Sequence, residues 1–436
     1  MVVDDRPRYP MTFIVQLELS GQLRASAFNQ AIEEALQRHP LLTSVVGPGK
    51  RGKDSWVAAP ELKPHVHWDK LDALIEFPNG EYLDIRRELG VRIFVRHDDQ
   101  KAFVTAQFHH STCDGIGAYQ FLGDILFYYA QQTGDNELEP LAELDLKRLK
   151  GRGRVSYDIN NFRLPDGKYQ RDWDEVLKHL TQSNVVLKAP TSKPKTFTRP
   201  FPGIQSFIFD KSDFKQLRLA AQSRGQIMND MLLEKLFESL HAWNHKHHFW
   251  PLRKNVAVMM PLNLREPTDN DLSACNVVAH AFVRRTKAQV QDKKKFRNDL
   301  GNELRHIKHS RHKIRFMHML VGGQHLYPKL MKATLNWKRS MATAILSNTG
   351  DPTRQFYTDF PRNKGVVQVG NLSLEGISGV PPLRPGTNAT VSIFTYRREL
   401  KICLRCDPNQ FSEQDTGSLL NAFVENLKLE LATSQA

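Results

Sequence analysis

Hydrophobic and polar positions along the chain follow the two periods that predict strands and helices. Residues 13–19 alternate apolar and polar side chains, which predicts a strand with one buried face. Residues 24–40 place apolar side chains at positions i, i+3, i+4, i+7 and i+8, which predicts a helix with one apolar face. Ser26 is a suitable N-cap for that helix, and Pro40 would end it. The chain therefore opens with a strand followed by an amphipathic helix.

The same two periods recur along the rest of the chain. Strands are predicted at 91–96, 101–110, 206–210 and 255–265 and as a hairpin at 389–406, and helices at 118–132, 212–223, 226–243, 289–316 and after 412. The turn-rich residues 135–200, with one further helix at 171–182, predict a crossover. Because strands and helices alternate on both sides of it, we expect an α/β (α+β) fold of two similar halves, residues 1–185 and 186–436.

Length and composition agree with a soluble protein large enough for two such halves. The chain has 436 residues, of which 40% are hydrophobic and 25% charged, as in ordinary globular proteins. No run of about 18 apolar residues that could span a membrane is present. The first residues mix acidic and basic side chains without an apolar stretch, which argues against a signal peptide.

The cysteines indicate a compartment but no obvious chemistry. The chain has four, Cys113, Cys275, Cys403 and Cys406, too few for a disulfide framework at this length. We therefore expect a reducing, cytoplasmic location. On an extended strand the side chains of Cys403 and Cys406 face opposite ways, which argues against a metal or redox pair.

The chain has more basic than acidic residues. The formal net charge is +14, which suits an anionic partner or a basic but inert surface. The excess is densest at 293–315, which is typical of a solvated helix face or of a docking patch. The ligands of such a patch would be CoA phosphates, an acidic carrier protein or an anionic membrane surface. No nucleic-acid-binding motif accompanies the charge, so we expect no nucleic-acid partner.

Residues 106–117, AQFHHSTCDGIG, carry the densest chemistry. Strand alternation puts His110 on the more apolar face and His109 on the other. A desolvated, neutral histidine is what general base catalysis at neutral pH requires. Two alternatives stay open at this point. The histidines could simply be structural residues at the end of a strand, or they could bind zinc with Cys113 or Asp114.

The stretch HHSTCDG (109–115) is similar to the HHxxxDG motif of the chloramphenicol-acetyltransferase-like superfamily, which includes condensation domains, alcohol acetyltransferases and wax ester synthase-like enzymes. Further segments also resemble family patterns in the expected order: EEALQRHPLLTSVV (33–46), MMPLNLR (259–265), SNTGD (347–351) and DPNQFS (407–412). The resemblance therefore extends over nearly the whole chain.

This resemblance implies two chloramphenicol-acetyltransferase-like halves in a V shape, with a tunnel between them. It implies transfer of an acyl group from a CoA or phosphopantetheinyl carrier thioester to an alcohol or amine acceptor. Neither a metal nor a tightly bound cofactor is expected. No adenylation or carrier module flanks the similar segments, so we expect a free-standing enzyme. The alternative is a non-catalytic relative that binds an acyl ligand or a partner protein.

The resemblance also implies roles for the matching residues. His110 would be the base, and His109 would be structural. Asp114 would be structural and would pair with Arg265 of the PLNLR segment. Gly115 would allow a tight turn, and its N–H would help to hold the thioester carbonyl as charge develops on it.

Five further residues are expected near the substrates. Ser111 and Cys113 lie inside the motif, where the family often has aliphatic residues. Ser347 and Asn348 could orient a carbonyl or could simply be turn residues beside Gly350. Asn263 belongs to the PLNLR segment. We expect these residues to line the substrate site.

Overall fold

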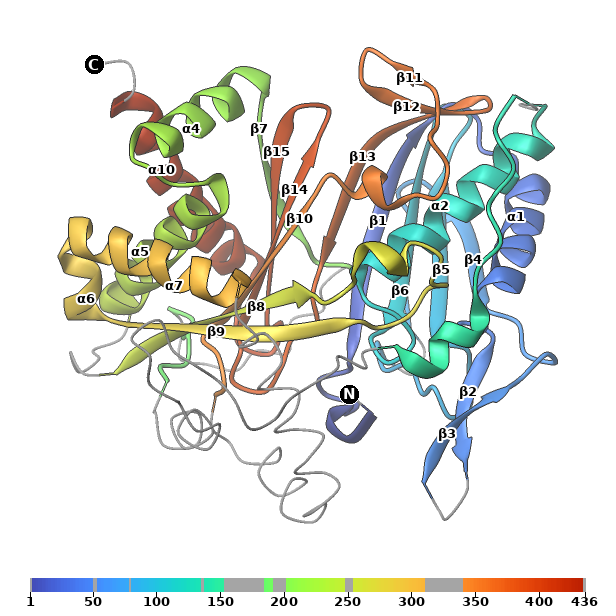
Figure 1. Ribbon diagram of the computed structural model, residues 1–436, viewed down its shortest axis with the longest axis horizontal. Coiled ribbons are helices and arrows are strands. Elements are labelled where there is room, and N and C mark those ends of the chain that lie inside the picture. Colours follow the sequence, from blue (N-terminus) through green and yellow to red (C-terminus); the bar gives the residue numbers. More distant parts are fainter. Residues whose placement is uncertain are drawn as a thin grey trace.

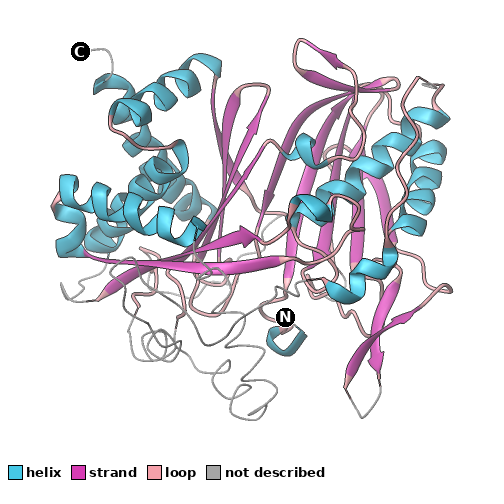
Figure 2. Ribbon diagram, viewed as in Figure 1, coloured by secondary structure: helices cyan, strands magenta, loops and turns pink. Residues whose placement is uncertain are grey.

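The computed structural model describes residues 2–49, 53–77, 80–134, 137–152, 184–190, 201–247, 254–309 and 340–433. Two twisted sheets lie side by side, each with helices packed on it (Figure 1). Figure 2 shows the strands of both sheets in the middle of the molecule and a group of helices on the outer side of one of them. This mixed α/β architecture confirms the fold class predicted from the sequence.

The first sheet has β1 at its centre. In hydrogen-bonding order its strands are β11 (Arg362–Asn363), β12 (Val366–Val369), β13 (Leu372–Val380), β1 (Thr12–Ser20), β6 (Lys101–His109), β5 (Val91–His97) and β4 (His65–Lys70). Helices α1 (Ala25–Arg38) and α2 (Gly115–Gln132) pack on one face of it (Figure 1). Their apolar side chains and the inner side chains of β1, β5 and β6 form one buried core.

The second sheet contains a parallel centre. Its order is β7 (Gln205–Phe209), β15 (Glu399–Cys406), β14 (Ala389–Tyr396), β10 (Ala344–Gly350), β8 (Asn255–Asn263) and β9 (Val278–Thr286). Strands β8, β10 and β14 run parallel. Helices α4 (Lys211–Ser223), α5 (Met228–His247) and α10 (Glu413–Thr433) pack against this sheet and form a second core with it.

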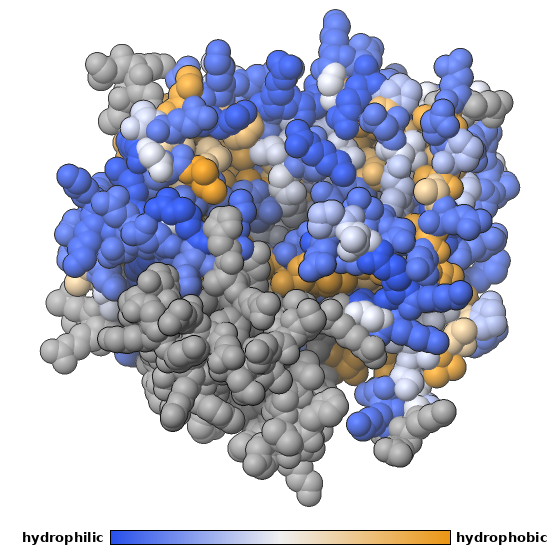
Figure 3. Space-filling model, viewed as in Figure 1, coloured by the Kyte–Doolittle hydropathy of each residue, from blue (hydrophilic) through white to orange (hydrophobic). Residues whose placement is uncertain are grey.

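The smaller elements lie around these layers. They are β2 (Ser44–Pro48) and β3 (Asp54–Ala58), which form a ribbon, helices α6 (Lys287–Gln291) and α7 (Lys293–His309), and the 3-10 helices η1 (Val2–Asp4), η3 (Leu146–Gly151), η4 (Pro267–Asp269) and η5 (Pro352–Gln355). The described residues on the face in Figure 3 are mostly hydrophilic. No helix in the described ranges is long and apolar enough to cross a lipid bilayer.

Most predicted elements are confirmed, with two corrections at helix ends. The first helix begins at Ala25, before Ser26, and the residue at its N-cap, Arg24, makes no side-chain capping bond. The described part of the stretch 289–316 belongs to two helices, α6 and α7, because the chain leaves the helical conformation at Asp292. Residues 310–316 lie outside the described residues. The helix expected at 171–182 lies outside the described residues.

The two sheets do not divide the sequence cleanly. Strands β11 to β13, residues 362–380, come late in the chain but hydrogen-bond into the first sheet, where β13 pairs with β1. The division into residues 1–185 and 186–436 stays a prediction, and β11 to β13 of its second part belong to the first sheet. The crossing has a consequence for the site, since β13 also lies against β14 and β15 of the second sheet.

The face on which each cysteine lies follows strand alternation as predicted. In β15, Cys403 packs into the core of the first sheet and Cys406 into the core of the second. Their sulfur atoms therefore lie on opposite sides of one sheet. All four cysteines are buried, and none of them forms a disulfide.

Candidate active site

A cavity of about 120 Å³ lies between the two sheets, at the end of β6. Its walls come from β1, the start of α2, β8, β9, β10 and β14, so both halves contribute. Most lining side chains are apolar, among them Phe13, Val15, Met259, Ile345 and Phe394. His110 lines this cavity. The arrangement places the imidazole of His110 in a largely apolar space.

His110 is held at the end of β6 by the neighbouring strand. Its backbone N–H donates to the Met11 carbonyl over 2.7 Å, and its ring packs on Phe13 with the ring centres 4.9 Å apart. Burial lowers the pKa of His110 to about 4, and the nearby Asp114 carboxylate opposes that shift only in part. The imidazole is therefore neutral at neutral pH.

A second polar residue touches His110 from the segment before β9. The Asn276 amide nitrogen lies 2.8 Å from Nδ1 of His110 and donates to the His110 carbonyl oxygen over 2.5 Å. The Asn276 side-chain oxygen accepts from the Val278 N–H over 3.2 Å, which fixes the amide's orientation. Nδ1 therefore faces the backbone, and Nε2 is the ring nitrogen left for the cavity.

His280, on β9, is a second histidine of the cavity wall. Burial and the neighbouring His110 lower the pKa of His280 to about 3. Both imidazoles are therefore neutral near pH 7, and neither histidine adds a positive charge to the cavity.

His109 points the other way and lies in a buried contact with Asp5. Its Nδ1 accepts from the Ser111 N–H over 3.1 Å, and its Nε2 lies 3.2 Å from the Asp5 carboxylate. Burial raises the pKa of Asp5, but hydrogen bonds from His109 and from the Met11 N–H lower it by more. His109 ties the N-terminal segment to β6 and does not line the cavity.

Asp114 and Arg265 form the contact expected between them. The guanidinium meets both carboxylate oxygens, at 2.7 Å and 3.0 Å, and both side chains are nearly buried. Asp114 also caps α2 through the Gly117 N–H and accepts from the Val277 N–H over 2.8 Å. Burial alone lowers the pKa of Arg265, but Asp114 raises it by more. The pair joins the start of α2 to the segment after β8, next to His110. Asp114 lines the cavity, but its carboxylate is already bound by Arg265 and by backbone N–H groups.

The glycine that allows close packing at this helix start is not Gly115. Gly115 does not adopt a positive φ, and a Cβ there would lie 3.8 Å from the Tyr119 ring, an ordinary contact. A Cβ at Gly117 would instead lie 2.9 Å from the Cys275 backbone nitrogen. Gly117 thus lets α2 approach the Cys275 segment, and Gly115 lines the cavity.

The five residues expected near the substrates divide into two groups. Ser347 lines the cavity, and Asn348, on the other face of β10, lines a separate groove. Ser111, Cys113 and Asn263 are not among the cavity-lining residues, which corrects that expectation. Cys113 is fully buried in the first core because it packs between strand and helix, and burial raises the pKa of its thiol. Asn263 is exposed and accepts from the Arg265 N–H over 3.0 Å.

Several polar residues of the site escaped the sequence analysis, among them His280, Tyr119 and Thr349 on the cavity wall and Asn276, which contacts His110. His280 was visible as a lone histidine in the apolar run VVAHAF, and Thr349 shares a strand face with Ser347. Tyr119 lies one helical turn after Gly115 and so faces the same side. Asn276 precedes its strand and carries no pattern that could have indicated it.

Nothing in the described part of the chain forms a metal centre. In those ranges no three histidine, cysteine or acidic side chains are grouped as a metal ion needs. His109 and His110 cannot share an ion as they lie, because one faces Asp5 and the other the cavity.

Comparisons with known proteins identify the fold. No protein-family model matches the chain, and no curated protein matches its sequence. Solved structures match over nearly the whole chain. The trichothecene 15-O-acetyltransferase from Fusarium sporotrichioides superposes with a TM-score of 0.68 at 13% identity, covering 98% of this chain and 91% of the acetyltransferase.

Two condensation domains match similarly. The first condensation domain of the CDA synthetase has a TM-score of 0.63 at 15% identity, over 99% of this chain and 92% of the domain. A variant of the starter condensation domain of rhizomide synthetase, in complex with C8-CoA, has a TM-score of 0.62 at 13% identity, over 98% of this chain and 90% of the domain. The chain therefore has the fold of condensation domains and of this acetyltransferase, as the sequence resemblance led us to expect.

Proposed function

We propose that this protein is an acyltransferase that moves an acyl group from a thioester to an alcohol or amine, with His110 as general base. The observation that carries the proposal is His110 itself: a neutral imidazole, with its pKa lowered to about 4, on the wall of a cavity between two sheets. Solved proteins with the same fold include an acetyltransferase and condensation domains, which supports this reaction class.

Base catalysis requires a lone pair of His110 that faces the acceptor. We assign the proton of the neutral ring to Nδ1, which can donate to the carbonyl oxygen of His110 itself. The Asn276 amide nitrogen, 2.8 Å from Nδ1, must then donate to that carbonyl oxygen and not to Nδ1. Nε2 then presents its lone pair to the cavity. In this form Asn276 keeps its bond to the carbonyl oxygen and holds the backbone of His110 in place.

The reaction needs no covalent enzyme intermediate. Nε2 takes the proton of the acceptor hydroxyl or amine while its oxygen or nitrogen attacks the thioester carbon. The tetrahedral oxyanion collapses and expels the thiolate, which takes the proton back from His110. The start of α2 supports the oxyanion, because the Gly115 N–H lies at a helix N-terminus and has no intrahelical acceptor.

The cavity favours this chemistry because most of its lining side chains are apolar. Apolar walls strengthen the interactions of the few polar groups inside and keep the imidazole uncharged. Ser347 and Tyr119 lie on the walls and can orient the two substrates. Holding two substrates in reacting geometry can itself lower the barrier by about 7–11 kcal/mol.

One assay tests the proposal. The purified protein is incubated with a panel of acyl-CoA and acyl-pantetheine donors and with alcohol and amine acceptors, and thiol release and ester or amide product are measured together. We expect product with at least one pair for the wild type and for the control His245→Ala, an exposed histidine of α5. His110→Ala should give none above background. Ligand binding without any product would favour a non-catalytic acyl-binding protein, and equal turnover by His110→Ala would exclude the histidine as base.

A further inference from the structure

A buried histidine outside the catalytic cavity connects three parts of the fold. His39 is the C-cap residue of α1, and its side chain has no exposed surface. It is not among the residues that line the cavity. Each of its two ring nitrogens has a partner, one on α2 and the other in the segment before β9. The proposed reaction does not assign a role to this residue.

The partner on α2 is a buried carboxylate. Nε2 of His39 lies 3.1 Å from Oδ2 of Asp124, and neither side chain is exposed. Arg38 donates from its Nε to the same carboxylate oxygen over 2.7 Å. The charge of Asp124 is thus compensated by Arg38, and the carboxylate fixes the orientation of the His39 ring.

The partner in the segment before β9 is a backbone group. The Ala274 N–H donates to Nδ1 of His39 over 2.9 Å. A backbone N–H can only donate, so Nδ1 carries the lone pair and Nε2 carries the ring proton. Nε2 then donates this proton to the Asp124 carboxylate. The two contacts together assign one tautomer to His39.

The segment 272–277 depends on such contacts because it has no regular secondary structure. Its backbone groups find their partners largely outside the sheet ladders, and buried backbone groups must be paired. The Val277 N–H donates to the Asp114 carboxylate over 2.8 Å. Ala274 is fully buried, so its N–H relies on His39 as its acceptor.

This segment carries the residue that touches the proposed base. The Asn276 amide nitrogen lies 2.8 Å from Nδ1 of His110 and 2.5 Å from the His110 carbonyl oxygen. The bonds at Ala274 and Val277 lie on either side of Asn276 in the chain. They therefore fix the backbone from which the amide reaches His110.

We propose that His39 is a positioning residue for acyl transfer: it orients residues 274–277 so that Asn276 holds the base. The inference rests on the proposed function and deepens it. Asp124 keeps the His39 ring turned towards the segment. Because His39 does not touch the substrates, its loss slows the chemical step and leaves donor binding unchanged.

Two substitutions separate the two bonds of His39. In His39→Asn, the side-chain oxygen lies near the place of Nδ1 and accepts from the Ala274 N–H, whereas the contact with Asp124 is lost. In His39→Gln, the longer amide reaches the place of Nε2 and donates to Asp124, whereas the Ala274 N–H loses its acceptor. We expect kcat to fall about 10- to 100-fold in His39→Gln and less than about threefold in His39→Asn. KM for the donor should change little in either variant.

Folding is measured alongside, and kcat is expressed per folded molecule. The matched control is His241→Gln, which replaces a buried histidine of α5 that does not line the cavity and should leave kcat as in the wild type. A residue that only stabilises the fold would lower the melting temperature and leave kcat unchanged in both His39 variants. That result would overturn the proposal. So would a fall in kcat for His39→Asn as large as that for His39→Gln.

A double variant tests the route through Asn276. If His39 acts through this amide, His39→Gln/Asn276→Ala should be about as slow as Asn276→Ala alone, because the group that His39 positions is already gone. Losses in kcat that multiply would show that His39 acts elsewhere, and they would contradict the proposal.

Nuclear magnetic resonance separates this inference from the proposed function. In protein with ¹⁵N-labelled histidines, the ring signals of His110 are assigned by their absence in His110→Ala. They should move in His39→Gln and stay near their wild-type positions in His39→Asn. If no donor reacts even with the wild type, the proposed function fails, and these signals alone decide whether His39 positions the ring. Unmoved His110 signals in His39→Gln would overturn the inference.

Discussion

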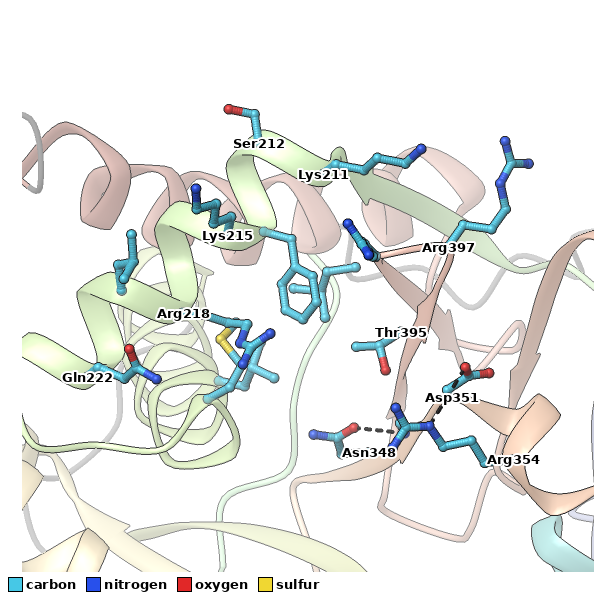
Figure 4. A pocket seen from close by; sticks show the side chains of 17 residues that line it. Lys211, Ser212, Lys215, Arg218, Gln222, Asn348, Asp351, Arg354, Thr395 and Arg397 are labelled. Atoms are coloured by element: carbon cyan, nitrogen blue, oxygen red, sulfur yellow. Dashed lines mark hydrogen bonds and ion pairs between the residues drawn. The ribbon is translucent and has the colours of Figure 1, made fainter. Parts of the chain in front are cut away.

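The two hollows on either side of β10 show opposite uses of polar chemistry. The catalytic cavity is small, apolar and placed between the sheets, and its histidines are uncharged because burial lowers their pKa values. The groove is open and lined with cations that stay in contact with water, among them Lys215, Arg218 and Arg354 (Figure 4). In the cavity, desolvation keeps the histidines neutral, as a general base must be. In the groove, desolvation of the lysines and arginines would be costly, and their hydration keeps them charged and able to bind an anion.

Adjacent residues can have different roles in this protein because successive side chains of a strand point to opposite faces of the sheet. Ser347 and Asn348 are adjacent, and each faces a different hollow. His109 and His110 are also adjacent, but one is locked against Asp5 and the other lines the cavity. In both pairs, the face of the strand on which a side chain lies determines its surroundings, so the role of one residue does not predict the role of the next.

The largest effect is expected at His110. His110→Gln removes the base from the cavity without adding a charge, so kcat should fall by about 10²–10⁴ with the melting temperature nearly unchanged. His109→Gln should do the reverse, since it breaks the contact with Asp5 in a buried site. Steady-state kinetics and thermal melts of both variants measure this. Similar kinetic losses in the two would remove the distinction between the adjacent histidines.

A strong effect on stability is expected where the two halves meet. Arg265→Met leaves the buried Asp114 carboxylate with only its backbone donors, and we expect the free energy of unfolding to fall by about 3 kcal/mol. Chemical denaturation measures the change. The double variant Asp114→Asn/Arg265→Met should recover part of it, because it removes the unpaired charge. A double variant less stable than both single variants would argue against a pair that acts through charge.

An intermediate effect is expected from a negative charge next to Nδ1 of His110. Asn276→Asp places a carboxylate near Nδ1, which stabilises the imidazolium and should raise the pKa of His110 by about 1–3 units. The acid limb of the pH dependence of kcat/KM should move upward with it. The isosteric wild-type amide serves as the control. An unmoved limb would mean that another group controls the reaction.

The smallest effect is expected from salt. Exposed charges are screened over about 8 Å at physiological ionic strength, so higher salt should raise KM for an acyl-CoA several-fold. The uncharged acyl-pantetheine should show no such change, because the cavity has no exposed cations comparable to those of the groove. Equal salt dependence for both donors would erase the difference between the two hollows.

Local sequence patterns predicted most helices and strands and the position of His110. The pairing of distant strands and the contacts of His110 with distant segments depend on long-range packing and were not predicted. Alternation separated His110 from His109 and Cys403 from Cys406, because a strand's two faces follow directly from its period. It could not predict that β13 would pair with β1, nor that Asn276 would reach His110 from a segment more than 160 residues away. The groove was equally hidden, since its cations come from α4, η5 and a hairpin turn that lie close together only in the folded chain.

The pH dependence of kcat/KM with an alcohol acceptor tests the central claim most directly. A base whose pKa lies near 4 is neutral throughout the range from pH 5.5 to 8, so kcat/KM should stay nearly constant there. A histidine with an ordinary pKa of about 6.5 would lose about nine-tenths of its neutral form at pH 5.5. A tenfold fall in kcat/KM between pH 7.5 and 5.5, with the fold intact by circular dichroism, would contradict a desolvated base at His110.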